Sequence, residues 1–197
     1  MNRRDIIKYA ALATGAAISV PLMTSLLSGC QSDISEKAED FIPQFFSKEE
    51  FALIKNLVDV ILPRTDSPSA TDVGVHRMID HMVDKVYNKE DQASYKQGFT
   101  GLISQLTGTT GGATPDVNKF LKLGADKKLA LLKKIDSSTA EALKDIRKAY
   151  LDLKQQTVAY YLSTEEISKN YLTYLPVPGK YEPCISVEAA GGKAWAI

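Results

Sequence analysis

The chain has 197 residues with 24 basic and 24 acidic side chains, so its formal net charge is zero. This balance excludes the basic surface of a typical nucleic-acid-binding protein. A hydrophobic share of 44% excludes a disordered chain. Two cysteines are too few for a disulfide-rich scaffold or a four-cysteine zinc site. The length allows one domain with a hydrophobic core.

The N-terminus has the pattern of an export signal. It begins N-R-R-D-I-I-K, with Arg3 next to Arg4, and residues 9–27 contain no charged side chain. A basic start before an apolar stretch is typical of a signal peptide, and paired arginines indicate the twin-arginine (Tat) type. The alternative is a permanent membrane helix, because the uncharged stretch of 19 residues is close to the shortest length that spans a bilayer.

The end of this segment, L-S-G-C at residues 27–30, resembles a lipobox, in which cleavage leaves an N-terminal cysteine that carries lipid. We therefore predict a signal peptide over residues 1–29 and a lipid anchor on Cys30. The protein would then be held at a membrane on the periplasmic side. Removal of the signal leaves 168 residues with a net charge of −2. Residues 30–44 are mostly polar and are predicted to form a tether to a domain over residues 45–197.

Hydrophobic residues in that domain recur with helical rather than alternating spacing, which predicts an irregular all-α domain of about six helices. Ser47 and Glu50 form a capping box at the start of the first helix, and Pro63 ends it. In two later helices, Met78, Val86 and Val158 fall on the face that is expected to be buried. The further segments with helical spacing are 75–87, 92–106, 115–121, 126–135, 138–162 and, after a capped start at Thr164, 164–175.

The C-terminal segment differs from the helices. Residues 170–184 read N-Y-L-T-Y-L-P-V-P-G-K-Y-E-P-C, which predicts an extended tail, and the only tryptophan is third from the end. Aromatic side chains on an extended tail are typical of a protein interface. An equally weighted alternative is that the tail folds back over its own helices. The candidate partner-binding residues are Tyr171, Tyr174, Pro176, Pro178, Gly179, Tyr181 and Trp195.

The remaining polar residues predict no catalytic, cofactor-binding or metal-binding site. His76 and His81 are five residues apart, so they point about 140° apart on a helix and do not form a metal-binding i, i+4 pair. Asp80 and Asp84 alternate with basic residues and are predicted to lie on a solvated face. Cys184 has no neighbouring histidine and is predicted to be a structural or tail cysteine instead of a nucleophile. An autonomous enzyme that uses Asp80 and Asp84 is the remaining enzymatic alternative.

A Tat signal on a chain without cofactor ligands indicates that a partner protein is exported with it. The Tat pathway chiefly exports proteins that fold before they cross the membrane, often around a cofactor. A helical domain of 168 residues without cofactor ligands has little need of this route. We therefore expect a second, cofactor-loaded protein without a signal of its own to be exported bound to this chain.

Several motifs, taken in order along the chain, resemble the gluconate 2-dehydrogenase subunit 3 family. Each motif alone is weak, and the specificity lies in their combination. They are the R-R-D-I-I-K start, F-F-S-K-E-E-F-A-L-I-K-N-L-V-D-V-I-L-P (45–63), D-S-P-S-A-T-D-V-G-V with M-I-D-H-M (66–82), Y-Y-L-S-T-E-E (160–166) and Y-L-P-V-P-G-K-Y-E-P-C (174–184).

The resemblance implies a non-catalytic small subunit of a membrane-bound, FAD-dependent sugar or sugar-acid dehydrogenase. In such a complex a flavoprotein of the glucose–methanol–choline class holds FAD and the catalytic residues, and a cytochrome c with haem c can take the electrons onward. The small subunit would supply the Tat signal and stabilise the flavoprotein. The alternative function is a free-standing exported lipoprotein that acts as a binding or scaffold module.

Overall fold

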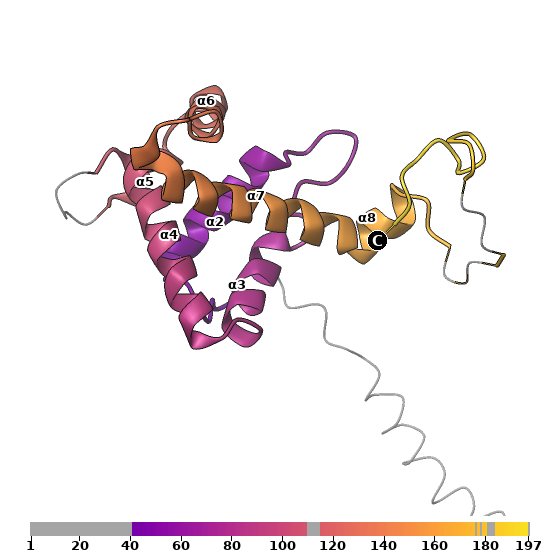
Figure 1. Cartoon of the computed structure of the whole chain (residues 1–197), viewed down its shortest axis with the longest axis horizontal. Helices are drawn as coiled ribbons and strands as arrows, with labels where there is room; N and C mark the ends of the chain where they lie inside the picture. The colour runs from indigo at the N-terminus through magenta and orange to yellow at the C-terminus, as the bar shows by residue number, and fades with distance from the viewer. Residues whose placement is uncertain (1–40, 110–114, 176, 178, 181–183, 197) are drawn as a thin grey trace, which may run out of the picture. The chain divides into compact units, whose positions relative to one another are not determined.

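The computed structural model describes residues 41–109, 115–175, 177, 179–180 and 184–196 (Figure 1). Within these residues the secondary structure consists of seven α-helices, one 3-10 turn and a single isolated β-bridge. The all-α prediction is therefore confirmed. Arg3, Arg4 and Cys30 lie outside the described residues. Across the described part of the chain, no helix combines the length and the apolar character that a membrane span requires.

The helices follow the predicted order, and most ends lie within a few residues of the predicted ones. The two larger differences are α7, which starts at Lys144 instead of residue 138, and α8, which ends at Asn170 instead of residue 175. The helices are α2 (Lys48–Ile61), α3 (Val75–Lys85), α4 (Lys89–Thr107), α5 (Val117–Leu121), α6 (Ala125–Asp136), α7 (Lys144–Ser163) and α8 (Glu165–Asn170), with the 3-10 turn Glu141–Leu143 before α7.

The start of α2 has the predicted capping box. The Glu50 N–H donates to Ser47 Oγ at 3.2 Å, and the Ser47 N–H donates to Glu50 Oε2 at 2.9 Å. Glu50 also pairs with Lys96 of α4. Burial raises the pKa of Glu50, but the hydrogen bonds from Lys96 and Ser47 outweigh this effect and lower it.

The side-chain cap expected from Thr164 at the start of α8 does not form. Thr164 Oγ1 donates back to the Tyr161 carbonyl at 2.8 Å instead of accepting from α8.

Helix α7 is the centre of the packing, because it contacts α2, α3, α4, α6 and α8. Its closest approach is to α4, where a Cβ on Gly98 would lie only 3.1 Å from the Cβ of Ala149. The apolar residues that form the core come from every helix of this bundle. Those exposed by less than 2% include Leu53, Ile54, Leu57, Val58, Val75, Ile79, Val83, Leu102, Phe120, Leu132, Leu153 and Ile167.

Three residues predicted to be buried are exposed. Val158 is 38% exposed, because the buried face of α7 runs through Leu153, Thr157 and Tyr161 and so passes beside it. Met78 is 39% exposed and lies beside the buried face of α3. Val86 is 63% exposed because α3 ends one residue before it. In α3 and α7 the apolar spacing correctly predicts a helix, but the predicted buried face is rotated by about one residue from the observed one.

Within residues 42–197, the C-terminal tail lies beside α8 (Figure 1). Helix α8 follows α7 after a turn at Thr164, whose ψ of 144° is extended instead of helical. In Figure 1 the tail, drawn in yellow, lies at the α8 end of α7, away from α5 and α6. The chain end labelled C returns to this same place beside α8. The tail is therefore presented at one end of the helical bundle.

Candidate partner-binding surface

The tail is a loop closed by hydrogen bonds at its base. The Thr173 N–H donates to the Ala194 carbonyl at 2.8 Å, and the Ala196 N–H donates to the Thr173 carbonyl at 3.0 Å. These two bonds make a parallel bridge between Thr173 and Trp195. Thr173 Oγ1 adds a third bond, to the Ala190 carbonyl at 2.6 Å. Thr173 thus fastens the last residues of the chain beside the end of α8.

A glycine turn sends the chain back toward Thr173. The Ala190 N–H donates to the Ser186 carbonyl, and the Gly192 N–H closes the turn on the Val187 carbonyl at 2.8 Å. Gly191 and Gly192 have φ values of 79° and 73°, in the left-handed region that glycine adopts without a Cβ clash. The two glycines therefore allow the turn that brings the following residues back to Thr173.

Most of the large apolar side chains that are exposed in the described chain lie in the tail. Seven of the twelve large apolar side chains that are exposed there lie between Tyr171 and Trp195. Clustered exposed apolar groups mark interaction sites more often than isolated ones do. These seven, which we call the tail surface, are Tyr171, Tyr174, Leu175, Val177, Ile185, Val187 and Trp195.

Four of the predicted partner-binding residues can be placed on this loop. Tyr171 is 36% exposed, Tyr174 is 46% exposed, Trp195 is 47% exposed and Gly179 is also exposed. Pro176, Pro178 and Tyr181 lie outside the described residues. Leu175, exposed by 51%, was missed because the prediction counted only aromatic residues, prolines and a glycine. Cys184 is an exposed free thiol on the same loop.

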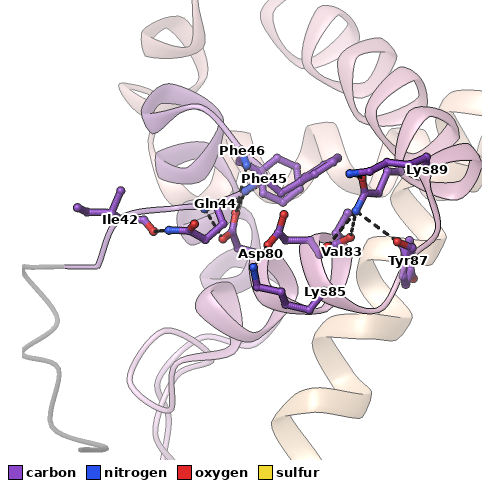
Figure 2. A network of polar contacts seen from close by, with 11 residues as sticks. Ile42, Gln44, Phe45, Phe46, Asp80, Val83, Lys85, Tyr87 and Lys89 are labelled. Atoms are coloured by element: carbon purple, nitrogen blue, oxygen red, sulfur yellow. Dashed lines mark hydrogen bonds and ion pairs between the residues drawn. The ribbon is translucent and has the colours of Figure 1, made fainter.

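The prediction that Asp80 lies on a solvated face is wrong. Asp80 is fully buried, and its carboxylate accepts the backbone N–H groups of Gln44 (2.7 Å), Phe45 (3.1 Å) and Phe46 (3.1 Å), as Figure 2 shows. The carboxylate thus fastens the segment before α2 onto α3. A signal was present in the sequence, because position 80 follows Ile79 and precedes Val83 by three residues on the buried helical face.

Asp84, predicted on the same solvated face, is only partly exposed, at 23% of its side chain, and the buried Gln92 was missed. Asp84 pairs with Lys85 at 2.6 Å, and this hydrogen bond lowers the pKa of the Asp84 carboxyl. Gln92 is buried, and its amide donates to the Val83, Asp84 and Tyr87 carbonyls at 2.9, 3.0 and 3.3 Å. Gln92 therefore satisfies the last carbonyls of α3 and fixes the turn into α4.

His76 is buried beside the ring of Phe51. Its side chain is 5% exposed, its ring centroid lies 5.3 Å from that of Phe51, and Nδ1 has no hydrogen-bond partner among the described residues. Burial, and then the positive charges of Lys55 and Arg77, lower the pKa of His76 to about 4. His81 is exposed on the same helix. No group of three or more metal-ligating side chains is assembled within the described ranges.

A groove of about 830 Å³ lies between α4 and α7. At one end, Gln156 donates to Tyr87 Oη at 2.7 Å and accepts from Tyr95 Oη at 3.0 Å. Burial raises the pKa of Tyr95, so this hydroxyl remains a hydrogen-bond donor at neutral pH. Asp91 and Asp152 also line the groove, and the described lining includes no histidine or cysteine. The groove therefore has polar walls and contains a hydrogen-bonded chain of Tyr95, Gln156 and Tyr87.

Comparison with known families decides the relationship that the sequence motifs indicated. The model of the family described as gluconate 2-dehydrogenase subunit 3 matches residues 48–179. The chain belongs to the gluconate 2-dehydrogenase subunit 3 family. No curated protein and no solved structure matches it.

The subunit 3 match covers most of the helical domain but not all of the tail surface. It runs from the start of α2 through α8 and includes Tyr171, Tyr174 and Leu175. Trp195 and the glycine turn at Gly191 and Gly192 lie beyond it. Membership makes this chain an accessory subunit associated with a gluconate dehydrogenase complex. The tail surface thus combines a part shared with the family model and a part outside it.

Proposed function

We propose that this subunit 3 protein is the non-catalytic small subunit of a membrane-associated, FAD-dependent sugar or sugar-acid dehydrogenase. The family match over residues 48–179 is the observation on which this proposal rests. Its catalytic partner is a flavoprotein of the glucose–methanol–choline type, which this chain stabilises and for which it supplies the export signal. Arg3 and Arg4 are the Tat residues, and lipid on Cys30 anchors the complex on the periplasmic side.

In this proposal the flavoprotein carries out catalysis and this chain provides a contact surface. FAD and the catalytic groups belong to the flavoprotein, and haem c belongs to a cytochrome c where the complex includes one. The side chains of this subunit are suited to contact: the tail surface is apolar, and the charged residues near it, such as Lys169 and Glu165, pair with each other at 2.6 Å. Covering apolar side chains of this kind contributes roughly 25 cal/mol per Å² removed from water.

The experiment that tests this function is purification of the chain from membranes of its host in mild detergent. We expect a larger protein with a flavin absorption spectrum to co-purify, together with dye-linked dehydrogenase activity on gluconate or an aldose. A chain that purifies as a colourless, stable monomer would contradict the proposal. That outcome would favour the free-standing exported lipoprotein instead.

A pair of matched variants tests the tail surface as the contact. Leu175→Ser removes an exposed leucine from the tail, and Leu129→Ser removes one from α6 that is 40% exposed. We expect Leu175→Ser to weaken association with the flavoprotein by about tenfold, the effect of losing one apolar anchor. Leu129→Ser should leave the affinity unchanged. Equal affinities for both variants would place the contact elsewhere.

A further inference from the structure

The backbone of Trp195 leaves one edge of the tail bridge open. Along an extended segment, successive peptide groups point to opposite sides. The Ala194 carbonyl and the Ala196 N–H both bond to Thr173, so the N–H and carbonyl of Trp195 point away from it. Neither group has a hydrogen-bond partner among the described residues. Unpaired groups of this kind on an exposed strand edge are a template for another extended chain.

The opposite side of the bridge is less accessible. There the Leu172 N–H already donates to the Ile167 carbonyl of α8 at 3.2 Å. Leu172 is also packed against the hydrophobic core, whereas Trp195 is 47% exposed. The end of α8 thus closes one edge and leaves the edge at residues 194–196 for a partner.

We propose that the flavoprotein partner contributes an extended segment that pairs with the backbone at residues 194–196 and adds a strand to the bridge. This inference rests on the proposed function and names the contact within it. The N–H and the carbonyl of one extended residue suit an extended peptide, which offers a free carbonyl and a free N–H side by side, whereas the backbone groups inside a helix already bond to each other. Trp195 provides an exposed apolar side chain on this edge for the segment to cover.

Amide hydrogen exchange on the full mature chain, alone and in the purified complex, tests the pairing directly. In the isolated chain the Ala196 amide should be protected by its bond to Thr173, whereas the Trp195 amide should exchange freely. In the complex the Trp195 amide should become protected by about tenfold or more. Fast exchange at Trp195 in an intact complex would overturn the inference. Failure to form any complex would instead contradict the proposed function.

Two substitutions at one position separate backbone pairing from side-chain contact. Trp195→Ala removes the ring and keeps the N–H, whereas Trp195→Pro removes both and leaves the bonds of Ala194 and Ala196 to Thr173 possible. We expect Trp195→Pro to bind the flavoprotein about tenfold more weakly than Trp195→Ala. Equal affinities would overturn the inference.

A control and a competing occupant complete the test. Lys48→Pro places proline at the first position of α2, where the ring is tolerated and which lies outside the tail surface, and it should bind as the wild type does within about twofold. If the Trp195 amide is instead protected in the isolated chain as its concentration rises, with the mass of a dimer, the occupant is a second copy and the proposal fails.

Discussion

At position 80 a carboxylate without solvent exposure accepts three backbone N–H groups from residues 44–46. These donors come from the segment that leads into α2, whereas Asp80 lies on α3, so the interaction is tertiary. Hydrogen bonds to a charged group stabilise more than neutral ones do. A single side chain thus determines how the domain begins, and its environment cannot be read from its charged neighbours.

Replacing Asp80 with alanine should destabilise the domain strongly, because three N–H groups then lose their acceptor. We expect the free energy of unfolding to fall by about 3 kcal/mol in urea denaturation. The matched control is Asp84→Ala, one turn later on α3, which removes only a pair with the exposed Lys85 and should cost less than about 1 kcal/mol. Similar losses for the two variants would contradict the role of Asp80.

His76 should make the domain sensitive to acid. Its folded pKa of about 4 lies below the ordinary 6.5, so below pH 6.5 the unfolded chain binds a proton that the folded chain excludes. The free energy of unfolding should therefore fall as the pH drops, by about 2 kcal/mol between pH 7 and pH 5. Glu50 and Asp72 have ordinary values of 4.5 and 3.8, so their lowered pKa values act below this window.

Two histidine variants isolate this effect in urea titrations at several pH values. His76→Leu should lose the acid-dependent fall, whereas His81→Leu, at an exposed position of the same helix, should retain it. A fall of unchanged size in His76→Leu would show that other groups cause it.

At the scale of the helices, the packing of α4 against α7 depends on glycine at one position more than at another. A Cβ on Gly98 would lie 3.1 Å from the Cβ of Ala149, which is tighter than ordinary contact. A Cβ on Gly101 would lie 3.5 Å from Cγ1 of Ile146, an ordinary van der Waals distance. The same substitution should therefore have different effects at these two neighbouring positions.

Gly101→Ala should raise the free energy of unfolding by about 0.5 to 1 kcal/mol, because alanine favours the helix over glycine. Gly98→Ala gains the same helix preference but forces α4 and α7 apart, so it should be less stable than Gly101→Ala by about 1 to 3 kcal/mol. Thermal or urea unfolding of the two variants side by side measures this difference. Equal stabilisation by both would contradict a close helix crossing at Gly98.

The elements were predictable where their signals are local. The capping box of Ser47 and Glu50 and the stop at Pro63 depend on residues within one turn of each helix end, and α2 has the expected start and end. Thr164 failed as a cap because its hydroxyl found a competing acceptor, the Tyr161 carbonyl. The local sequence offers both partners and does not decide between them.

The candidate site was predictable in composition but not in geometry. Aromatic residues and prolines indicated an extended tail, and Tyr174 and Trp195 are exposed on it. The bridge between Thr173 and Trp195 joins positions far apart in sequence, so no local pattern encodes it. Asp80 was misplaced for the same reason, since its three donors come from another segment.

At the scale of the whole molecule, the chain combines a stable bundle with an exposed apolar end. The buried residues of α2, α3, α4 and α7 form one contiguous core, whereas the tail surface leaves seven large apolar side chains in water. Selection for solubility opposes such exposure in a protein that acts alone. A partner that covers the tail resolves this conflict, and the N-terminal sequence offers a reason why the two would leave the cytoplasm together.

Exchanging Arg3 and Arg4 for lysine should retain the flavoprotein in the cytoplasm as well as this chain. The physical reason is that a folded partner without a signal crosses only while bound to a chain that has one. Fractionation followed by dehydrogenase assays on each compartment measures the effect. The matched control is Cys30→Ala, which removes only the lipid attachment and should leave activity exported but released from the membrane. Unchanged export of the flavoprotein in the double lysine variant would contradict the carrier role.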